Sequence, residues 1–281
     1  MKKNIFFLNL AYAGPVLAAA LSLGLSLASC SKDKNNSKDK NNQKPEEITL
    51  TTTLDVDNEI ELSFDVKDQP VVEGAEIEGL PQMAGQWLKN KYKLKAKNLI
   101  IKGKVTRFDC SGSNVTDLDV SNNTKLTELV CNKNALNSLD LGKNKELITL
   151  GCSENENLST LVFGNNDKLK NIYCSGCGFV RLNLSPNKAL ERLFCQGNKL
   201  EGLDLSANNK LGDVDCSSNN KVLGSNFKMP KLEKEGRLLF KVEGEDQKLS
   251  IKQVGELEAN KWKVQMHPKA GGGYLDYKGE D

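Results

Sequence analysis

The chain has 281 residues, with 39 Lys and Arg against 37 Asp and Glu, so its formal net charge at pH 7 is only +2. Two of the basic residues, Lys2 and Lys3, lie in a predicted targeting segment, which leaves the rest of the chain close to neutral. No basic excess remains to neutralise phosphate groups, and this argues against a nucleic-acid partner.

The N-terminus has the composition of a secretory signal. Lys2 and Lys3 precede an almost wholly apolar stretch, residues 5–28, and the sequence Leu-Ala-Ser-Cys ends at Cys30. A stretch this long can also span a bilayer, but the residues after it form a tether and not a stop-transfer segment. Leu-Ala-Ser-Cys resembles a bacterial lipobox. The resemblance implies a signal peptide over residues 1–29, a lipid on Cys30, and a lipid-anchored place in the cell envelope, at the outer membrane or cell surface of a Gram-negative bacterium.

The next two segments differ sharply in composition. Residues 30–45 are rich in Ser, Lys, Asp and Asn and lack apolar side chains able to anchor a core, so we predict a disordered tether. Residues 48–54 and 60–66 alternate apolar and polar side chains as half-buried strands do, and residues 55–59 fit a hairpin turn between them. We predict a β-rich N-terminal cap over residues 46–104, in which Met83 and Trp87 cover the open end of the first coil.

Residues 105–226 contain five full copies of a 21-residue unit, the third with one extra residue, and a sixth copy that fades after Val222. The shared pattern is LxxLxCxxNxLxxLDLxxNxx. The copies begin at Val105, Leu126, Leu147, Leu169, Leu190 and Leu211. Six cysteines follow the same period at position 6: Cys110, Cys131, Cys152, Cys174, Cys195 and Cys216. A constant period indicates a repeat and not a disulfide framework.

Asparagines recur with the same register. Position 19 holds Asn123, Asn144, Asn166, Asn187 and Asn208, and position 9 holds Asn134, Asn155, Asn198 and Asn219, with Ser113 and Cys177 as departures. This is the leucine-rich-repeat signature. The cysteine ladder and the second Leu-Asp-Leu segment resemble the internalin-J-like group of bacterial surface proteins, some of which are adhesins. The resemblance covers about residues 105–227 and implies a mostly-β solenoid of about six 21-residue coils.

Elementary energetics explain why such coils stack. One coil buries about six apolar side chains, too few to offset the entropy of ordering 21 residues, so neighbouring coils must supply a continuous core. Positions 4, 6, 14 and 16 are predicted to point inward from two extended segments that form parallel sheets. The Asn side chains at positions 9 and 19 are expected to bond the backbone of the turns, with simple turn formation as the alternative.

Residues 227–281 are predicted to close the other end of the stack, because an open solenoid end exposes its core. Residues 237–242 and 262–266 read as strands, and residues 249–260 read as a helix. We therefore predict a small βαβ-like C-terminal cap.

Three groups of residues invite a chemical interpretation. Cys174 and Cys177 have the CxxC spacing of redox and zinc sites, but no second ligand pair exists, so we predict reduced structural thiols, with a local disulfide between these two as the alternative. His267 is the only histidine and no nucleophile motif accompanies it, so we expect a surface residue and no enzyme. Asp119, Asp140 and Asp204 recur at position 15, where a solvated face is favoured over a calcium site. We expect no metal and no cofactor.

The outward residues of the first extended segment are the candidate binding surface. Positions 3, 5 and 7 line one sheet face, on which Tyr173 and Phe194 are expected to be neighbours with Arg192 beside them. Aromatic and Arg side chains are enriched at interface hot spots, although cross-strand packing alone also accounts for such a pair. The predicted binding residues are Glu128, Val130, Tyr173, Arg192, Phe194, Asp213 and Asp215.

The sequence therefore favours a monomeric envelope lipoprotein that touches the membrane only through its lipid and binds a protein on a host or bacterial surface, as an adhesin does. A glycan- or peptide-capturing accessory lipoprotein of an outer-membrane uptake system is the alternative. An enzyme acting through its caps is a third hypothesis, for which we find no paired acid and base.

Overall fold

A computed structural model describes residues 45–66, 71–78, 87, 89–219, 227–242, 248–268 and 273–280. The predicted signal peptide, the lipidated Cys30, nearly all of the tether, and Met83 lie outside these residues. Within them, no helix combines the length and the apolar composition needed to cross a bilayer.

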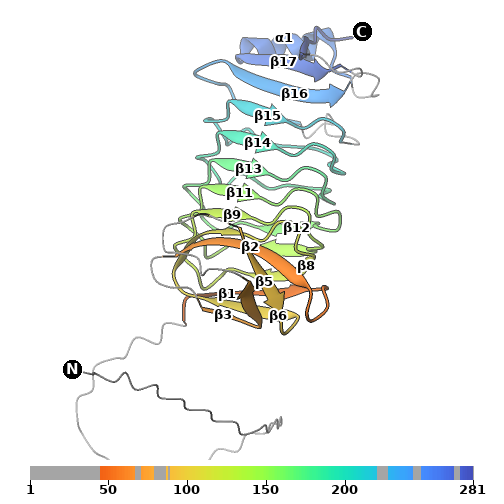
Figure 1. Cartoon of the computed structure of the whole chain (residues 1–281). Helices are drawn as coiled ribbons and strands as arrows, with labels where there is room; N and C mark the ends of the chain where they lie inside the picture. The colour runs from red at the N-terminus through yellow and green to blue at the C-terminus, as the bar shows by residue number, and fades with distance from the viewer. Residues whose placement is uncertain are drawn as a thin grey trace, which may run out of the picture. The chain divides into compact units, whose positions relative to one another are not determined.

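The repeats form a leucine-rich-repeat solenoid, because each copy contributes one strand to a single twelve-stranded sheet (Figure 1). Equivalent residues of successive coils pair in parallel, so that Leu129, Leu150 and Ile172 lie side by side. The coil strands are β7 (Val105–Asp109), β9 (Glu128–Val130), β11 (Thr149–Gly151), β13 (Asn171–Tyr173), β14 (Arg192–Phe194) and β15 (Asp213–Asp215).

The interior of the stack is built as the repeat pattern predicts. Positions 1, 4 and 6 of all six coils are at most 2% exposed, including every cysteine of the ladder. All seven cysteines among the described residues are buried and form no disulfide, so the prediction of an interior thiol column is confirmed. A thiol is small and weakly polar, which lets each coil bend into its next turn without leaving a cavity.

The asparagines of position 9 act as rungs between coils. Asn198 donates from Nδ2 to the carbonyl oxygens of Cys174 and Cys195, at 2.8 and 2.9 Å, and accepts from the Phe179 N–H at 3.2 Å. Asn155 makes the same three hydrogen bonds two coils earlier in the chain. These bonds satisfy buried turn backbone that has no strand partner.

The second side of the coils departs from the prediction of a continuous parallel sheet. Of its strands β8 (Val115–Asp119), β10 (Ser138–Asp140) and β12 (Thr160–Val162), only β10 and β12 pair with each other. Residues 181–184 form no strand. The position-14 leucines Leu118 and Leu161 are only half-buried here, so less apolar surface draws these segments together than on the first side.

The N-terminal cap pairs with both sides of the first coil. Its strands are β1 (Glu47–Thr52), β2 (Glu59–Val66), β3 (Val71–Glu73), β4 (Ala75–Glu78), β5 (Asn90–Leu94) and β6 (Asn98–Lys102). The predicted hairpin over residues 55–59 is wrong: β1 pairs with β6 and β8, whereas β2 pairs with β5 and β7. The two strands enter different sheets because the first coil offers an open edge on each side.

The C-terminal residues add β16 (Gly236–Val242), α1 (Ile251–Ala259), β17 (Trp262–His267) and β18 (Leu275–Asp276). β16 continues the parallel sheet from β15, and β17 pairs in parallel with β16 after the helix. Ser250 and Gln253 form a capping box that fixes the start of α1. Trp262 is 1% exposed and donates from Nε1 to the Pro230 carbonyl at 2.8 Å, closing the core at this end.

Candidate functional site

The front face is the outer surface of the long sheet, formed by positions 3 and 5 of strands β7, β9, β11, β13, β14 and β15 and by position 7 just beyond each strand. Strand alternation sends position 4 into the core and its two neighbours outward. Because the coils repeat in register, each position becomes a straight row along the stack. Row 3 consists of Arg107, Glu128, Thr149, Asn171, Arg192 and Asp213, and row 5 consists of Asp109, Val130, Gly151, Tyr173, Phe194 and Asp215.

Tyr173 and Phe194 lie next to each other in row 5, as the repeat register predicts. Their strands pair directly, and their ring centroids are 5.5 Å apart at an interplanar angle of 85°. Both side chains are half-buried, so part of each ring remains open to solvent. Gly151 precedes them in the row, and a Cβ there would lie only 3.3 to 3.4 Å from the side chains of Asn132 and Val130.

Arg192 is exposed beside this aromatic pair. Among the described residues it makes no ion pair, in contrast to the other charged members of row 3. Its strand neighbour Asn171 bonds Thr149 at 3.2 Å, and its other neighbour Asp213 is bound by Arg237. The centre of the front face therefore presents two aromatic rings and one free guanidinium.

The two ends of the front face are closed by what we call Arg clamps, each an Arg held between a carboxylate and an aromatic ring. At one end, the Arg107 guanidinium lies 2.8 Å from Glu128 and 4.1 Å from the centroid of Trp87. At the other end, Arg237 makes two 2.9 Å bonds to Asp213 and lies 4.7 Å from the centroid of Tyr274. Trp87 was predicted to cover the open end of the first coil, but it lies over the outward side chain of Arg107 on the front face, and strands β1 and β2 pair with the open edges of that coil.

The structure changes the status of three predicted binding residues. Glu128 and Asp213 are already paired inside the two Arg clamps. Asp215 is only 6% exposed, so its prediction as an accessible binding residue is wrong. It accepts from the N–H and hydroxyl of Ser217, at 3.0 and 2.7 Å, and its second oxygen lies 3.7 Å from His267 Nε2.

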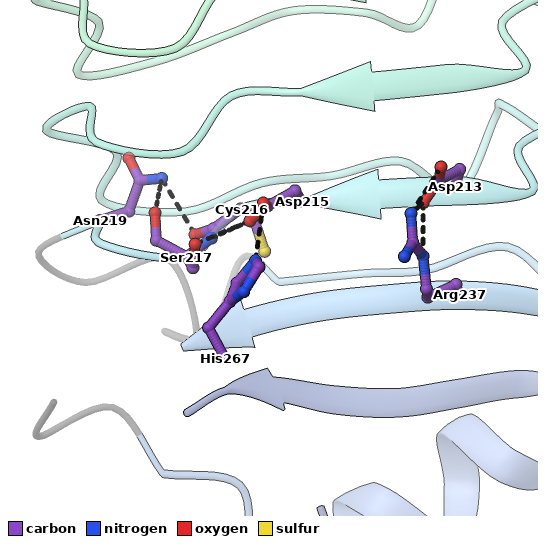
Figure 2. A network of polar contacts seen from close by, with 7 residues as sticks. All are labelled: Asp213, Asp215, Cys216, Ser217, Asn219, Arg237 and His267. Carbon is purple, nitrogen blue, oxygen red and sulfur yellow. Dashed lines mark hydrogen bonds and ion pairs between the residues drawn. The ribbon is translucent and has the colours of Figure 1, made fainter. Parts of the chain in front are cut away.

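Polar contacts join the last coil to the C-terminal cap around Asp215 (Figure 2), and their geometry fits a structural role and not a catalytic one. The Ser217 hydroxyl and the His267 ring both contact the carboxylate of Asp215 and not each other. The Ser217 hydroxyl therefore has no base aligned to activate it as a nucleophile. His267 is half-buried, with its ring 4.7 Å from that of Tyr274, and it is less exposed than predicted. The network ties the C-terminal cap to the last coil.

Cys177 lies in the Asn slot of position 9 and is 4% exposed. Its thiol donates to the Cys152 carbonyl at 3.2 Å, so its partner is in the preceding coil and not at Cys174. The Cys152 thiol lowers the pKa of Cys177, whereas burial raises the pKa of the ladder thiol Cys174. No cluster of metal-ligating residues occurs within the part of the chain that the structure describes.

The Asp residues of position 15 organise turns. Asp119 and Asp140 each accept from the N–H two residues later at 2.8 Å, and Asp204 does the same at 3.0 Å. Hydrogen bonds from Ser206 and from Lys228 lower the pKa of Asp204 to about 2. Two hollows of about 440 and 470 Å³ lie on this side, where successive segments do not pair. The carboxylates thus have a local role in shaping the backbone.

Sequence reasoning missed the Arg clamps because their aromatic members lie outside the repeats. The charged residues Arg107 and Asp213 at position 3 of the repeat were the only signal in the sequence that pointed to the clamps. Trp87 and Tyr274 come from cap segments whose path the repeat period does not determine.

The chain matches no protein-family model and no curated protein sequence. Among solved structures it is similar to the functional domain of InlJ from Listeria monocytogenes, described as including a cysteine ladder, with 25% sequence identity and a TM-score of 0.44. The match covers 57% of this chain and spans only 38% of that domain structure.

Proposed function

We propose that this protein is a lipid-anchored, internalin-J-like envelope protein that binds another protein through the centre of its front face. The observation that carries the proposal is the half-buried Tyr173–Phe194 pair beside the unpaired Arg192. Aromatic rings and guanidinium groups supply much of the binding energy at protein interfaces. The other charged residues of row 3 pair with each other or with Arg237 in the two Arg clamps, which leaves Arg192 as the one unpaired charge of that row among the described residues.

The rigidity of the platform supports a binding role. Positions 3 and 5 lie on strands whose intervening residue is fully buried, as Ile172 and Leu193 are. Side chains held on such a sheet lose little further entropy when a partner arrives. By contrast, the polar network at Asp215 lacks the Ser–His alignment that hydrolysis through a serine nucleophile requires. We therefore favour adhesion or surface interaction over catalysis.

Site-specific photo-crosslinking in the producing cells tests the proposal, because it captures a bound partner of any identity. A photoreactive residue replaces Asn171 on the front face, and a matched control replaces Val162, which is 45% exposed on the second side. We expect adducts from position 171 that a protease digests, and few from position 162. Adducts that resist protease but yield to glycosidases would favour glycan capture, and equal adduct formation at both positions would contradict the proposal.

The anchoring part of the proposal rests on Cys30 and is tested separately. Cys30→Ser is expected to move the protein from the membrane fraction to the soluble envelope or the medium and to abolish labelling by a radioactive fatty acid. Unchanged membrane association of this variant would show that another segment holds the protein.

A further inference from the structure

Three arginines lie in one line on the front face, and only the outer two have both a carboxylate partner and an aromatic ring against the guanidinium. Arg107 and Arg192 belong to row 3, and Arg237 continues that row into β16, because Asp213 pairs with it in register. Each outer Arg has a carboxylate within 2.9 Å and an aromatic ring within 4.7 Å. Arg192 has neither an ion-pair partner nor a stacked ring among the described residues.

The carboxylate nearest in register to Arg192 is engaged elsewhere. Asp213 is the direct strand neighbour of Arg192, but both of its oxygens bond Arg237. That bidentate geometry is the strong form of an Arg–carboxylate pair, so Asp213 has little to gain by turning to Arg192. The exposed Arg192 therefore keeps its hydrogen-bond donors available for a partner.

From this arrangement we infer that Arg192 receives an acidic peptide segment of the partner, with an Asp or Glu side chain close to an aromatic residue. The inference rests on the proposed function and names the chemistry that the same site recognises. In the bound state the partner carboxylate pairs with Arg192 and its aromatic ring packs on the guanidinium or on Tyr173 and Phe194, which reproduces the two Arg clamps.

Charge and chemistry favour a peptide over other acidic ligands. The centre of the front face exposes one unpaired positive charge, and the carboxylates next to it are engaged, Asp213 by Arg237 and the buried Asp215 by Ser217, so the complement of the exposed charge is a single carboxylate. Both Arg clamps use an aromatic ring as their second element, and proteins supply such rings whereas acidic sugars do not. An acidic glycan would meet the guanidinium but leave the ring position empty.

Selection from a display library of random octapeptides on the immobilised mature protein tests the inference. We expect enrichment of peptides with Asp or Glu within two residues of Phe, Tyr or Trp. For an enriched peptide, fluorescence anisotropy should show about tenfold weaker binding to Arg192→Gln, since a charged hydrogen bond is lost. Arg181→Gln, which removes an exposed charge from the second side, should bind as the wild type does.

The possible results separate the inference from the proposed function. Absence of enrichment, enrichment without a carboxylate, or equal binding to Arg192→Gln would each overturn the inference. Binding of sialyllactose or polygalacturonate through Arg192, with no peptide enriched, would also overturn it in favour of an acidic glycan. If position 171 still gives protein adducts in cells while the peptide selection fails, the proposed function stands and only the partner chemistry is wrong.

Discussion

Replacing Asn198 by Ala removes one rung of the ladder that joins successive coils. The Asn198 side chain makes three buried hydrogen bonds, to Phe179 N, Cys174 O and Cys195 O. Cys195 O keeps a second partner, Asn219 Nδ2 at 2.9 Å. The Phe179 N–H and the Cys174 carbonyl are left unpaired, and at about 1–3 kcal/mol for each buried orphan the variant loses about 2–6 kcal/mol of unfolding free energy.

A matched control lies one coil away in the same slot. Cys177→Ala removes the thiol bonds to Cys152 O and to Ser175 O. Both oxygens keep a partner, because Cys152 O still accepts from Asn155 Nδ2 at 2.9 Å and Ser175 O from the Glu154 N–H at 2.7 Å. No backbone group is orphaned, so we expect a loss of about 1 kcal/mol. Urea unfolding followed by circular dichroism measures both variants. Equal losses would refute the reasoning that Asn holds the turns through backbone groups no other residue satisfies.

Three further predictions concern the core and the caps. Burial raises the pKa of Cys131, so the folded chain holds a proton that the unfolded chain releases. Stability should therefore fall as the pH rises above about 8.5, the usual pKa of a thiol, as urea titrations at successive pH values would show. Cys177 should react with a thiol reagent before the ladder thiols do in native protein, read by mass spectrometry. Gly74→Ala should prevent stable folding, because Gly74 has a φ of +87° and the new Cβ would lie within 2.4 Å of the Asn98 carbonyl, whereas Gly255→Ala, in open space on α1, should raise the melting temperature slightly.

The sequence predicts most of the solenoid because the repeat period itself carries the geometry. The spacing of Cys110 to Cys216 places six thiols in one interior column, and the structure confirms that placement. The same register makes Tyr173 and Phe194 neighbours, as observed. In these elements each local pattern is copied several times, so its meaning does not depend on distant contacts.

The pattern fails where contacts come from outside the repeats. Alternation correctly indicates β1 and β2 as strands, but it cannot say that they pair with different sheets. Asp215 is outward by strand alternation and is nevertheless buried, because Ser217 and His267 enclose its carboxylate. Such partners are set by the path of the caps and not by a periodic signal.

The most direct test is whether Tyr173 and Phe194 bind a partner protein or only stabilise the sheet. Adduct yield from a photoreactive residue at position 171 is compared between the wild-type background and Tyr173→Ala/Phe194→Ala. Edge-to-face packing contributes about 1 kcal/mol beyond burial, and truncation of two half-buried rings also removes their buried apolar surface. We therefore predict a large fall in adduct yield in a variant that remains folded, with a melting temperature lowered by about 10 °C at most. A full adduct yield accompanied by a large loss of stability would show that these rings hold the sheet together and that the front face does not bind through them.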